Sequence, residues 1–170
     1  MDEAEQDLTN LVTVNLLVAT GADEDPFFES VLVRPVGGDR HVVHASPGML
    51  AGLAAGDEIE LAPDDPLGFR VLRRGGNVCV QFLRNGEMSE CTPDLTARVG
   101  ALGGWLDGET PGLLVFTIPV VAGFPAIERI FAERSSVILV AAGSMAMSTT
   151  PPIASPLCIG GSRGHPPSDD

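Results

Sequence analysis

Short runs of apolar and β-branched residues, separated by glycine pairs and acidic turns, fill the first half of the chain. This pattern is typical of antiparallel strands joined by hairpins. A tight turn is predicted at Gly37-Gly38-Asp39, because two glycines can adopt the positive φ that hairpin turns need. The apolar residues 48–55 contain good helix formers and are predicted to form a single helical turn. Strands are predicted over residues 11–20, 27–36, 41–45, 57–61, 69–73 and 78–83.

Helical signals begin in the second half of the chain. Thr92 followed by Pro93 is typical of a helix start, and the helix is predicted to run to about residue 102. Gly103-Gly104 marks its end, since glycine readily adopts the left-handed conformation that closes helices. Apolar periodicity and continuous apolar runs predict a second helix over residues 124–133 and strands over residues 113–121 and 136–142.

These elements predict an α+β fold, in which an antiparallel, barrel-like curved sheet packs with a C-terminal β-α-β-α-β layer. The sheet corresponds to a β subdomain at residues 11–84 and the layer to an α/β subdomain at residues 85–142. Residues 1–10 form an acidic N-terminal arm. Residues 143–170 are rich in Pro, Ser and Gly, which bury too little apolar surface to offset the entropy of ordering, so a disordered tail is predicted.

The charge of the chain excludes several classes of function. Arginine supplies all 10 basic residues, against 23 acidic ones, so the net charge of the 170-residue chain is −13. Without lysine, Schiff-base, pyridoxal-phosphate and phosphate-loop chemistry is excluded. The negative charge disfavours nucleic acid and anionic membranes as partners. No cofactor is predicted, because GxGxxG, GxxxxGK[ST], HExxH and GxSxG motifs do not occur.

Three features favour a soluble protein of a reducing cytoplasm. The acidic N-terminus lacks the positive charge and apolar run of a signal peptide. The apolar stretch at residues 137–147 is shorter than the roughly 18–20 residues that a membrane-spanning helix needs. The cysteines at positions 79, 91 and 158 are odd in number and widely spaced, unlike a disulfide framework.

Four short motifs follow one another along the chain, FESVLV at residues 28–33, AGDEI at 55–59, LGG at 102–104 and LLVFTIP at 113–119. Their order resembles that of a bacterial family known as domain of unknown function 4265. The similarity extends over residues 11–134, about three quarters of the chain. The resemblance implies a shared fold, and it brings no established activity.

Gly56 and Asp57 are predicted to form a structural turn. Glycine can adopt positive φ, and the aspartate carboxylate can accept hydrogen bonds from backbone N–H groups of a neighbouring turn. Aspartate is also a common acid or base in enzymes, so a catalytic Asp57 is the alternative interpretation.

The histidines do not predict a metal site. His41 and His44 are three residues apart in a predicted strand, so their side chains project to opposite faces and cannot jointly bind one metal ion. No pair of histidines or cysteines has the spacing of a structural zinc site. His44 is interpreted as a hydrogen-bonded structural residue, and its alternative role is that of a general base.

The cysteines differ in their predicted surroundings. Cys79 lies within a predicted strand and is expected to be a buried, inert thiol. Cys91 directly precedes the first predicted helix, whose N-terminus favours an anion and so lowers a thiol pKa. The acidic neighbours Glu87, Glu90 and Asp94 act in the opposite direction. Cys91 is therefore a candidate nucleophile with an unfavourable electrostatic setting.

Arg70, Arg73 and Arg74 form a basic cluster. Charged residues are common on exposed edge strands, where they prevent unwanted pairing, and this is the first interpretation. The second is a ligand-binding site for a carboxylate or phosphate, which the planar guanidinium can grip with two hydrogen bonds.

Two hypotheses of function follow from these observations. The first is a non-catalytic accessory protein that binds a protein partner or a small molecule, because catalytic signatures are missing and an acidic surface can complement a basic partner. The second is a small tailoring enzyme that acts on a peptide or an anionic metabolite. In that case His44 and Asp57 would supply acid–base chemistry and the arginines would bind the substrate. Convergence of these residues on one pocket would favour the enzyme.

Overall fold

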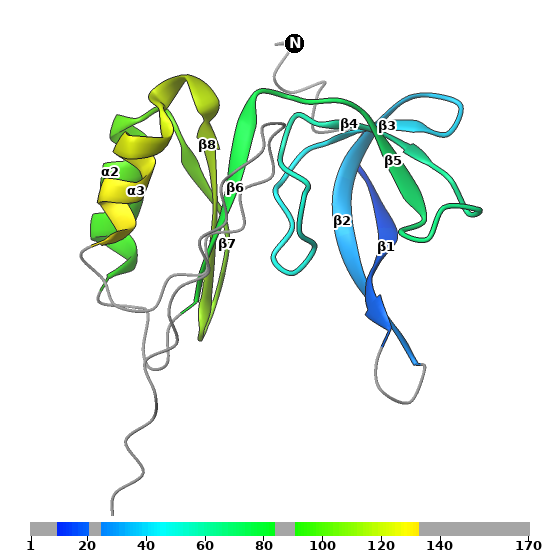
Figure 1. Cartoon of the computed structure of the whole chain (residues 1–170), viewed down its shortest axis with the longest axis horizontal. Coiled ribbons are helices and arrows are strands. Elements are labelled where there is room, and N and C mark those ends of the chain that lie inside the picture. The colour runs from blue at the N-terminus through cyan, green and yellow to red at the C-terminus, as the bar shows by residue number, and fades with distance from the viewer. Residues whose placement is uncertain (1–9, 21–24, 84–90, 133–170) are drawn as a thin grey trace, which may run out of the picture.

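The computed structural model of the protein describes residues 10–20, 25–83 and 91–132. Within them the chain forms two separate antiparallel sheets and two α-helices (Figure 1). The first half supplies strands β1 (Val12–Thr20), β2 (Pro26–Gly37), β3 (Arg40–Val43), β4 (Glu58–Leu61) and β5 (Phe69–Arg73). The second half supplies β6 (Asn77–Leu83), α2 (Thr92–Ala101), β7 (Trp105–Thr110), β8 (Leu113–Pro119), the 3-10 helix η1 (Val120–Ala122) and α3 (Phe124–Ala132).

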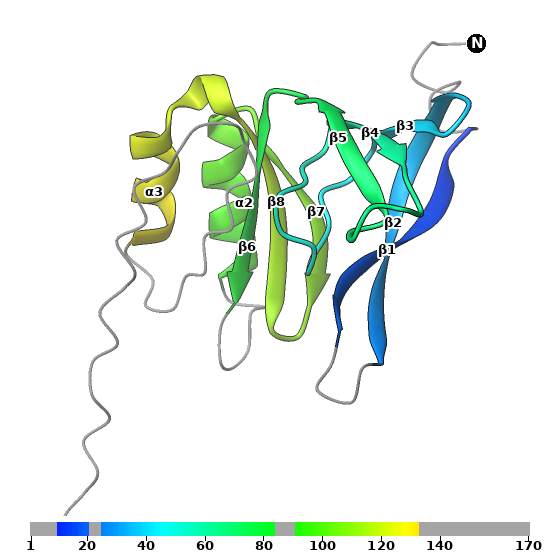
Figure 2. The ribbon, with the colours of Figure 1, turned by 45° about the vertical axis from the view of Figure 1, so that its right-hand side comes forward.

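The first sheet follows the order of the chain, β1-β2-β3-β4-β5, and neighbouring strands are antiparallel. Side chains alternate along β2, so Val31 and Val33 are buried whereas Ser30 and Leu32 are exposed. The buried face of this sheet forms one apolar cluster, which also includes Leu53 of the loop between β3 and β4. The sheet is curved and open (Figures 1 and 2), so the predicted α+β class with a curved N-terminal sheet is confirmed.

In the second sheet, β8 lies between β6 and β7 and is antiparallel to both. β6 and β7 are consequently parallel, and α2 connects them as the crossover of a split β-α-β unit. Both helices cover the same face of this sheet (Figure 2). Between helices and sheet lies the helix cluster, an apolar core in which Phe131 packs on Phe82 and Phe116 with ring centroids 6.0 Å apart.

The other face of the second sheet is turned toward the first half of the chain (Figure 2). There Cys79 of β6 and Val115 of β8 pack against Ala54, in a small group that we call the junction cluster. Gln81 and Cys79 also donate hydrogen bonds to the carbonyl oxygen of Pro47, at 3.2 and 3.5 Å. The loop between β3 and β4 therefore fills the space between the two sheets.

The sheet to which residues 78–83 belong differs from the prediction. The prediction places residues 78–83 in the first sheet, but β6 pairs with β8 in the second. The predicted β-α-β-α-β layer also omits β7, so the described order is β-α-β-β-α. The first error arises because pairing with a strand distant in sequence decides sheet membership, and the local pattern carries no trace of it. The second arises because β7 has no fully buried side chain and so lacks the alternation that marks a strand. The predicted strand at 136–142, the tail and residues 1–9 lie outside the described residues.

Residues 48–55 form turns and bends, and the predicted helical turn is wrong. Gly52 has φ +83°, so the main chain leaves the helical region in the middle of the segment. The Glu29 carboxylate of β2 holds the start of this loop. It accepts hydrogen bonds from the N–H groups of Gly48, Met49 and Leu50, at 2.5, 3.0 and 2.8 Å.

The connection between the sheets is fixed by a contact between two main chains. A Cβ atom at Gly75 would lie 2.2 Å from the carbonyl carbon of Gly56, so only glycine fits at position 75. Beside it, Asn77 Nδ2 donates a hydrogen bond to the carbonyl oxygen of Ala55 at 2.8 Å. The segment between β5 and β6 is therefore attached to the loop that precedes β4.

Candidate functional site

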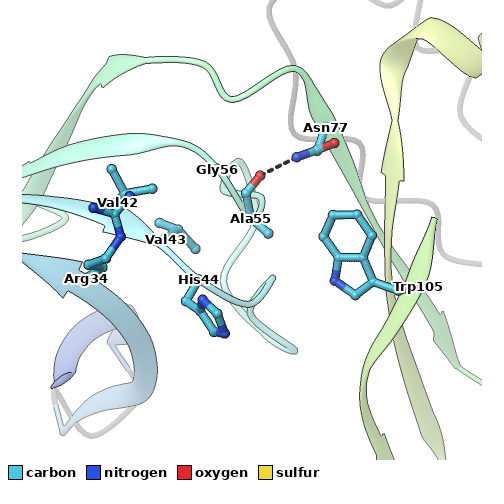
Figure 3. Close-up of a pocket in the computed structure, with 8 residues that line it drawn as sticks. All are labelled: Arg34, Val42, Val43, His44, Ala55, Gly56, Asn77 and Trp105. Atoms are coloured by element: carbon cyan, nitrogen blue, oxygen red, sulfur yellow. Dashed lines mark hydrogen bonds between the residues drawn. The ribbon is translucent and has the colours of Figure 1, made fainter. Parts of the chain in front are cut away.

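A hollow of about 210 Å³ opens at the junction of the two sheets (Figure 3). The first sheet and its loop supply one wall, and β6 and β7 supply the other. The described residues that line the hollow are Arg34, Val42, Val43, His44, Ala55, Gly56, Asn77 and Trp105. Both halves of the chain thus contribute to one concave surface, the kind of place where ligands bind.

Strand register builds the wall on the first sheet. Arg34 of β2 pairs with Val42 of β3, and both are half-buried on the face opposite the apolar cluster. Their neighbours Val33 and Val43 are buried in that cluster, as the alternation of a strand requires. His44 follows β3 on the same side as Val42, so a guanidinium and an imidazole flank an apolar patch (Figure 3).

Trp105 forms the opposite wall. It is the first residue of the edge strand β7, and its exposure is 42%. Its Nε1 donates a hydrogen bond to Asp107 Oδ1 at 2.9 Å. The polar edge of the indole is thus bound to the protein, and the ring stands across the hollow from Arg34 (Figure 3).

A β-bulge places Asp107 beside Trp105. The register between β7 and β8 shifts between Leu106 and Gly108, so Asp107 is the extra residue, and bulges commonly redirect a side chain. Its carboxylate accepts a second hydrogen bond, from Thr117 Oγ1 at 2.5 Å. Burial raises the pKa of Asp107, and the hydrogen bonds from Thr117 and Trp105 lower it in part.

From Thr117 the hydrogen bonds continue across the junction. Its hydroxyl lies 2.5 Å from Ser46 Oγ, which accepts a hydrogen bond from the backbone N–H of Ala55 at 3.0 Å. Thr117 and Ser46 are both buried. We call the series Trp105, Asp107, Thr117, Ser46 and Ala55 the junction chain.

Asp57 is not among the described residues that line the hollow. Its carboxylate is fully buried and accepts hydrogen bonds from the N–H groups of Ala54 and Gly75, at 3.1 and 2.8 Å. It also forms an ion pair with Arg74 Nη1 at 2.9 Å. Gly56, directly before it, has φ +87°. In this arrangement Asp57 can hold two turns together, and it has no path to a substrate in the hollow.

The predicted arginine cluster does not gather on the hollow. Arg73 pairs with Glu58 at 3.4 Å and Arg74 with Asp57, while Arg70 makes ion pairs with three carboxylates. Those partners of Arg70 are Glu60, Asp64 and Asp65. Each of these three guanidinium groups forms an ion pair within the protein, and none of them lines the hollow. Arg34 is one of the described residues that line the hollow.

Both described cysteines, Cys79 and Cys91, are buried thiols. Burial raises the pKa of Cys79 to about 12, and the charges of Asp107 and Glu29 add to this effect. Cys91 is 1% exposed in the helix cluster at the start of α2. Neither thiol lines the hollow, so the structure does not bring Cys91 together with His44.

The described residues contain no group of three or more histidine, cysteine, aspartate or glutamate side chains that could hold a metal ion. His41 is buried on the inner side of β3, with Nδ1 3.0 Å from the carbonyl oxygen of Asp39, whereas His44 faces the hollow. The two rings therefore lie on different sides of the sheet.

Of the residues singled out in the sequence, His44 and Gly56 line the hollow. Sequence reasoning missed Arg34, Asn77, Trp105 and Asp107. One signal was available, because Trp105 is the only tryptophan of the chain and Asp107-Gly108 directly follows it with the residues of a bulge or turn. Nothing in the local pattern pointed to Arg34.

Comparisons with known proteins add information about the fold. A family model described as Domain of unknown function (DUF4265) matches residues 29–141. A hypothetical protein from Neisseria gonorrhoeae, known from a crystal structure, is similar with a TM-score of 0.62 and 13% sequence identity. The match covers 80% of this chain and 96% of that one. A comparison with curated proteins finds no match. Among the helices of the described residues, none has the length and apolar character needed to cross a membrane.

Proposed function

Because this chain belongs to the DUF4265 family, whose description assigns no activity, we propose its function from its own geometry. The resemblance predicted from its motifs is thereby confirmed. We propose a non-catalytic accessory protein that binds a carboxylate-bearing ligand in the hollow between its two sheets.

The charge of the hollow carries this proposal. Acidic residues outnumber arginines by 23 to 10 in the chain, yet none of the eight described lining residues is acidic. Arg34 and His44 stand at one side of the hollow, and Trp105 stands at the other (Figure 3). A guanidinium favours a carboxylate through paired hydrogen bonds, and an indole favours a flat apolar body.

The geometry favours binding over acid–base catalysis. A general base must reach the proton that it removes, and a pair of catalytic groups must share one site. His44 faces the hollow, but Asp57 is fully buried among Ala54, Gly75 and Arg74. The predicted His44 and Asp57 pair is therefore not assembled.

A carboxylate can reach the hollow in two forms. It can belong to a free small molecule, or it can be the C-terminal or side-chain carboxylate of a protein partner. The shared chemistry is an anionic group joined to an apolar body, because both walls would then be used. We further propose a cytoplasmic location in a bacterium, since three widely spaced cysteines, at positions 79, 91 and 158, do not resemble a disulfide framework and suit a reducing compartment.

The test compares carboxylates with their neutral amides, which have nearly the same shape. Benzoate and benzamide are titrated against the full chain, and so are a short peptide that ends in Phe with a free carboxylate and the same peptide as an amide. Binding is followed by the emission of Trp105 and by the melting temperature. We expect the two carboxylates to bind, and the better of them identifies the source.

Arg34→Gln should weaken carboxylate binding by roughly tenfold, the factor that corresponds to about 1.4 kcal/mol. Arg129→Gln is the matched control, because Arg129 lies on α3 and does not line the hollow. Equal binding of the carboxylate and the amide would contradict the proposed ligand class. Conversion of a bound ligand into a product, detected by NMR of the ligand, would contradict a non-catalytic role.

A further inference from the structure

Trp105 is bound at its polar edge while its ring remains exposed. Nε1 donates to Asp107 Oδ1 at 2.9 Å, and the residue is 42% exposed. A tryptophan at the start of an edge strand has several staggered rotamers open to it, and a partner for the ring N–H selects among them. The bond to Asp107 therefore decides where the indole stands relative to Arg34 and His44 (Figure 3).

The carboxylate that holds Trp105 is itself fixed by buried hydroxyl groups. Thr117 is 0% exposed and Ser46 is 6% exposed, so water does not compete freely for their hydrogen bonds. Thr117 Oγ1 joins Asp107 to Ser46, with 2.5 Å on each side. The junction chain thus links the indole on the second sheet to Ala55, which lines the hollow from the other half of the molecule.

The hydrogen bonds of the junction chain converge on the carboxylate of Asp107. Ser46 Oγ accepts a hydrogen bond from Ala55, and Thr117 donates its single hydroxyl hydrogen to Asp107. The Ser46 hydroxyl can donate its hydrogen to Thr117 Oγ1 or to the Asp107 carboxylate. Asp107 accepts hydrogen bonds from Trp105 Nε1 and Thr117 Oγ1, and hydrogen bonds from Ser46 also act on its carboxylate, an arrangement that suits an ionised acceptor. An amide or a protonated carboxyl group at position 107 carries a hydrogen of its own. That hydrogen would be directed at one of the two donor groups, on Thr117 or Trp105.

We infer that ionised Asp107 is a positioning residue, which sets the Trp105 indole against the hollow and ties it to the loop at Ala55. This inference rests on the proposed function in one respect, that Trp105 is a wall of the ligand site. A ligand packed on the indole meets a surface whose orientation depends on a carboxylate that the ligand does not touch.

Acid should release the indole without unfolding the protein. Burial raises the pKa of Asp107, so the folded protein binds this proton more tightly than the unfolded chain does. Its contribution to stability is therefore present at low pH and is lost as the pH rises through the folded-state pKa. Other titratable groups of this region are Cys79 of β6, on which the charges of both Asp107 and Glu29 act, and His44, which lines the hollow together with Trp105.

The emission of Trp105 tests the inference directly, because the chain contains one tryptophan and no tyrosine. In the full chain, Asp107→Asn should shift the emission to longer wavelength and increase quenching by acrylamide. In this variant the population in which the Trp105 indole is hydrogen-bonded to residue 107 should fall roughly tenfold relative to the population in which it is not. This factor corresponds to about 1.4 kcal/mol. Glu109→Gln is the matched control on the same strand, since Glu109 bonds to Thr92 at 2.9 Å and should leave the emission unchanged.

A pH titration separates positioning from a merely structural role. Wild-type emission should undergo a reversible change in mild acid, with circular dichroism showing that the protein stays folded. Asp107→Asn should lack this change. Because that variant retains every other titratable group of the chain, a transition that persists in it would come from a group other than Asp107 and would overturn the inference. Unaltered emission of Asp107→Asn at neutral pH would overturn it as well.

If Asp107→Asn does not fold, two substitutions at Thr117 decide the matter. Thr117→Ser keeps the hydroxyl and should retain the wild-type emission, whereas Thr117→Val removes the link between Asp107 and Ser46 and should shift it. Identical spectra for the two variants would contradict the inference. Failure of benzoate and of the peptide carboxylate to bind would refute the proposed function, and it would leave these measurements on the free protein unaffected.

Discussion

At the scale of single residues, the carboxylate of Asp57 illustrates how far a sequence can be interpreted. The Gly56-Asp57 pair predicts a turn, because glycine takes positive φ and aspartate accepts backbone hydrogen bonds nearby. The bond to Ala54 is of this local kind. The other two partners, Arg74 and Gly75, lie 17 and 18 positions along the chain, where a local pattern cannot identify them.

Replacement of Asp57 should lower stability in a graded way. Asp57→Ala leaves the N–H groups of Ala54 and Gly75 and the guanidinium of Arg74 without their acceptor, so the free energy of unfolding should fall by roughly 3 kcal/mol or more. Asp57→Asn keeps one acceptor oxygen, so its free energy of unfolding should lie between those of wild type and Asp57→Ala. Urea unfolding followed by circular dichroism measures the three proteins.

Asp64→Asn is the control for this series, because the Asp64 side chain is 79% exposed and its ion pair with Arg70 is screened by solvent. Its unfolding free energy should stay within about 0.5 kcal/mol of wild type. A common unfolding midpoint for wild type, Asp57→Asn and Asp57→Ala would show that the carboxylate does not support the fold.

At the scale of elements, strands and helices with a strong apolar pattern were predictable and weakly patterned ones were not. Residues 113–121 are almost continuously apolar, and the predicted strand matches β8 to within two residues. β7 has the sequence WLDGET, without a fully buried side chain and with a bulge in its middle. Neither alternation nor a continuous apolar run can mark such an edge strand, although it carries Trp105 and Asp107.

The connection between β5 and β6 makes a prediction about two glycines. Gly75→Ala would place a Cβ atom 2.2 Å from the main chain of Gly56, so the two segments must separate and the unfolding free energy should fall by about 3 kcal/mol or more. Gly100→Ala adds a Cβ to α2 with nothing within 4 Å. It should raise the unfolding free energy by about 0.5–1 kcal/mol, because alanine favours the helix.

Thermal unfolding of both variants checks that Gly75→Ala lowers the stability and that Gly100→Ala raises it. The same chemical change is made twice, so a shared shift of the melting temperature would point to a general effect of alanine. A Gly75→Ala protein as stable as wild type would contradict the close approach of the two main chains.

At the scale of the whole molecule, the sequence predicts the α+β class but not how the sheets share the chain. The glycine pair at positions 75 and 76 resembles an ordinary hairpin turn between two strands of one sheet. Its role as the passage from the first sheet to the second appears only once β6 is paired with β8. The hollow depends on this connection, because one wall comes from residues that precede it in the chain and the other wall from residues that follow it.

The apolar interior is divided by this architecture, and each of two compartments holds one thiol. Cys79 belongs to the junction cluster and Cys91 to the helix cluster, and both are 1% exposed. A thiol reagent can reach Cys79 only when the junction cluster opens, and it can reach Cys91 only when the helix cluster opens. The labelling rates of the two thiols therefore measure the two openings separately. In a chain carrying Cys158→Ser, Asp107→Asn should speed labelling of Cys79, while Leu95→Ala in α2 should speed that of Cys91. Equal acceleration at both thiols in both variants would mean that the molecule opens as one cooperative unit.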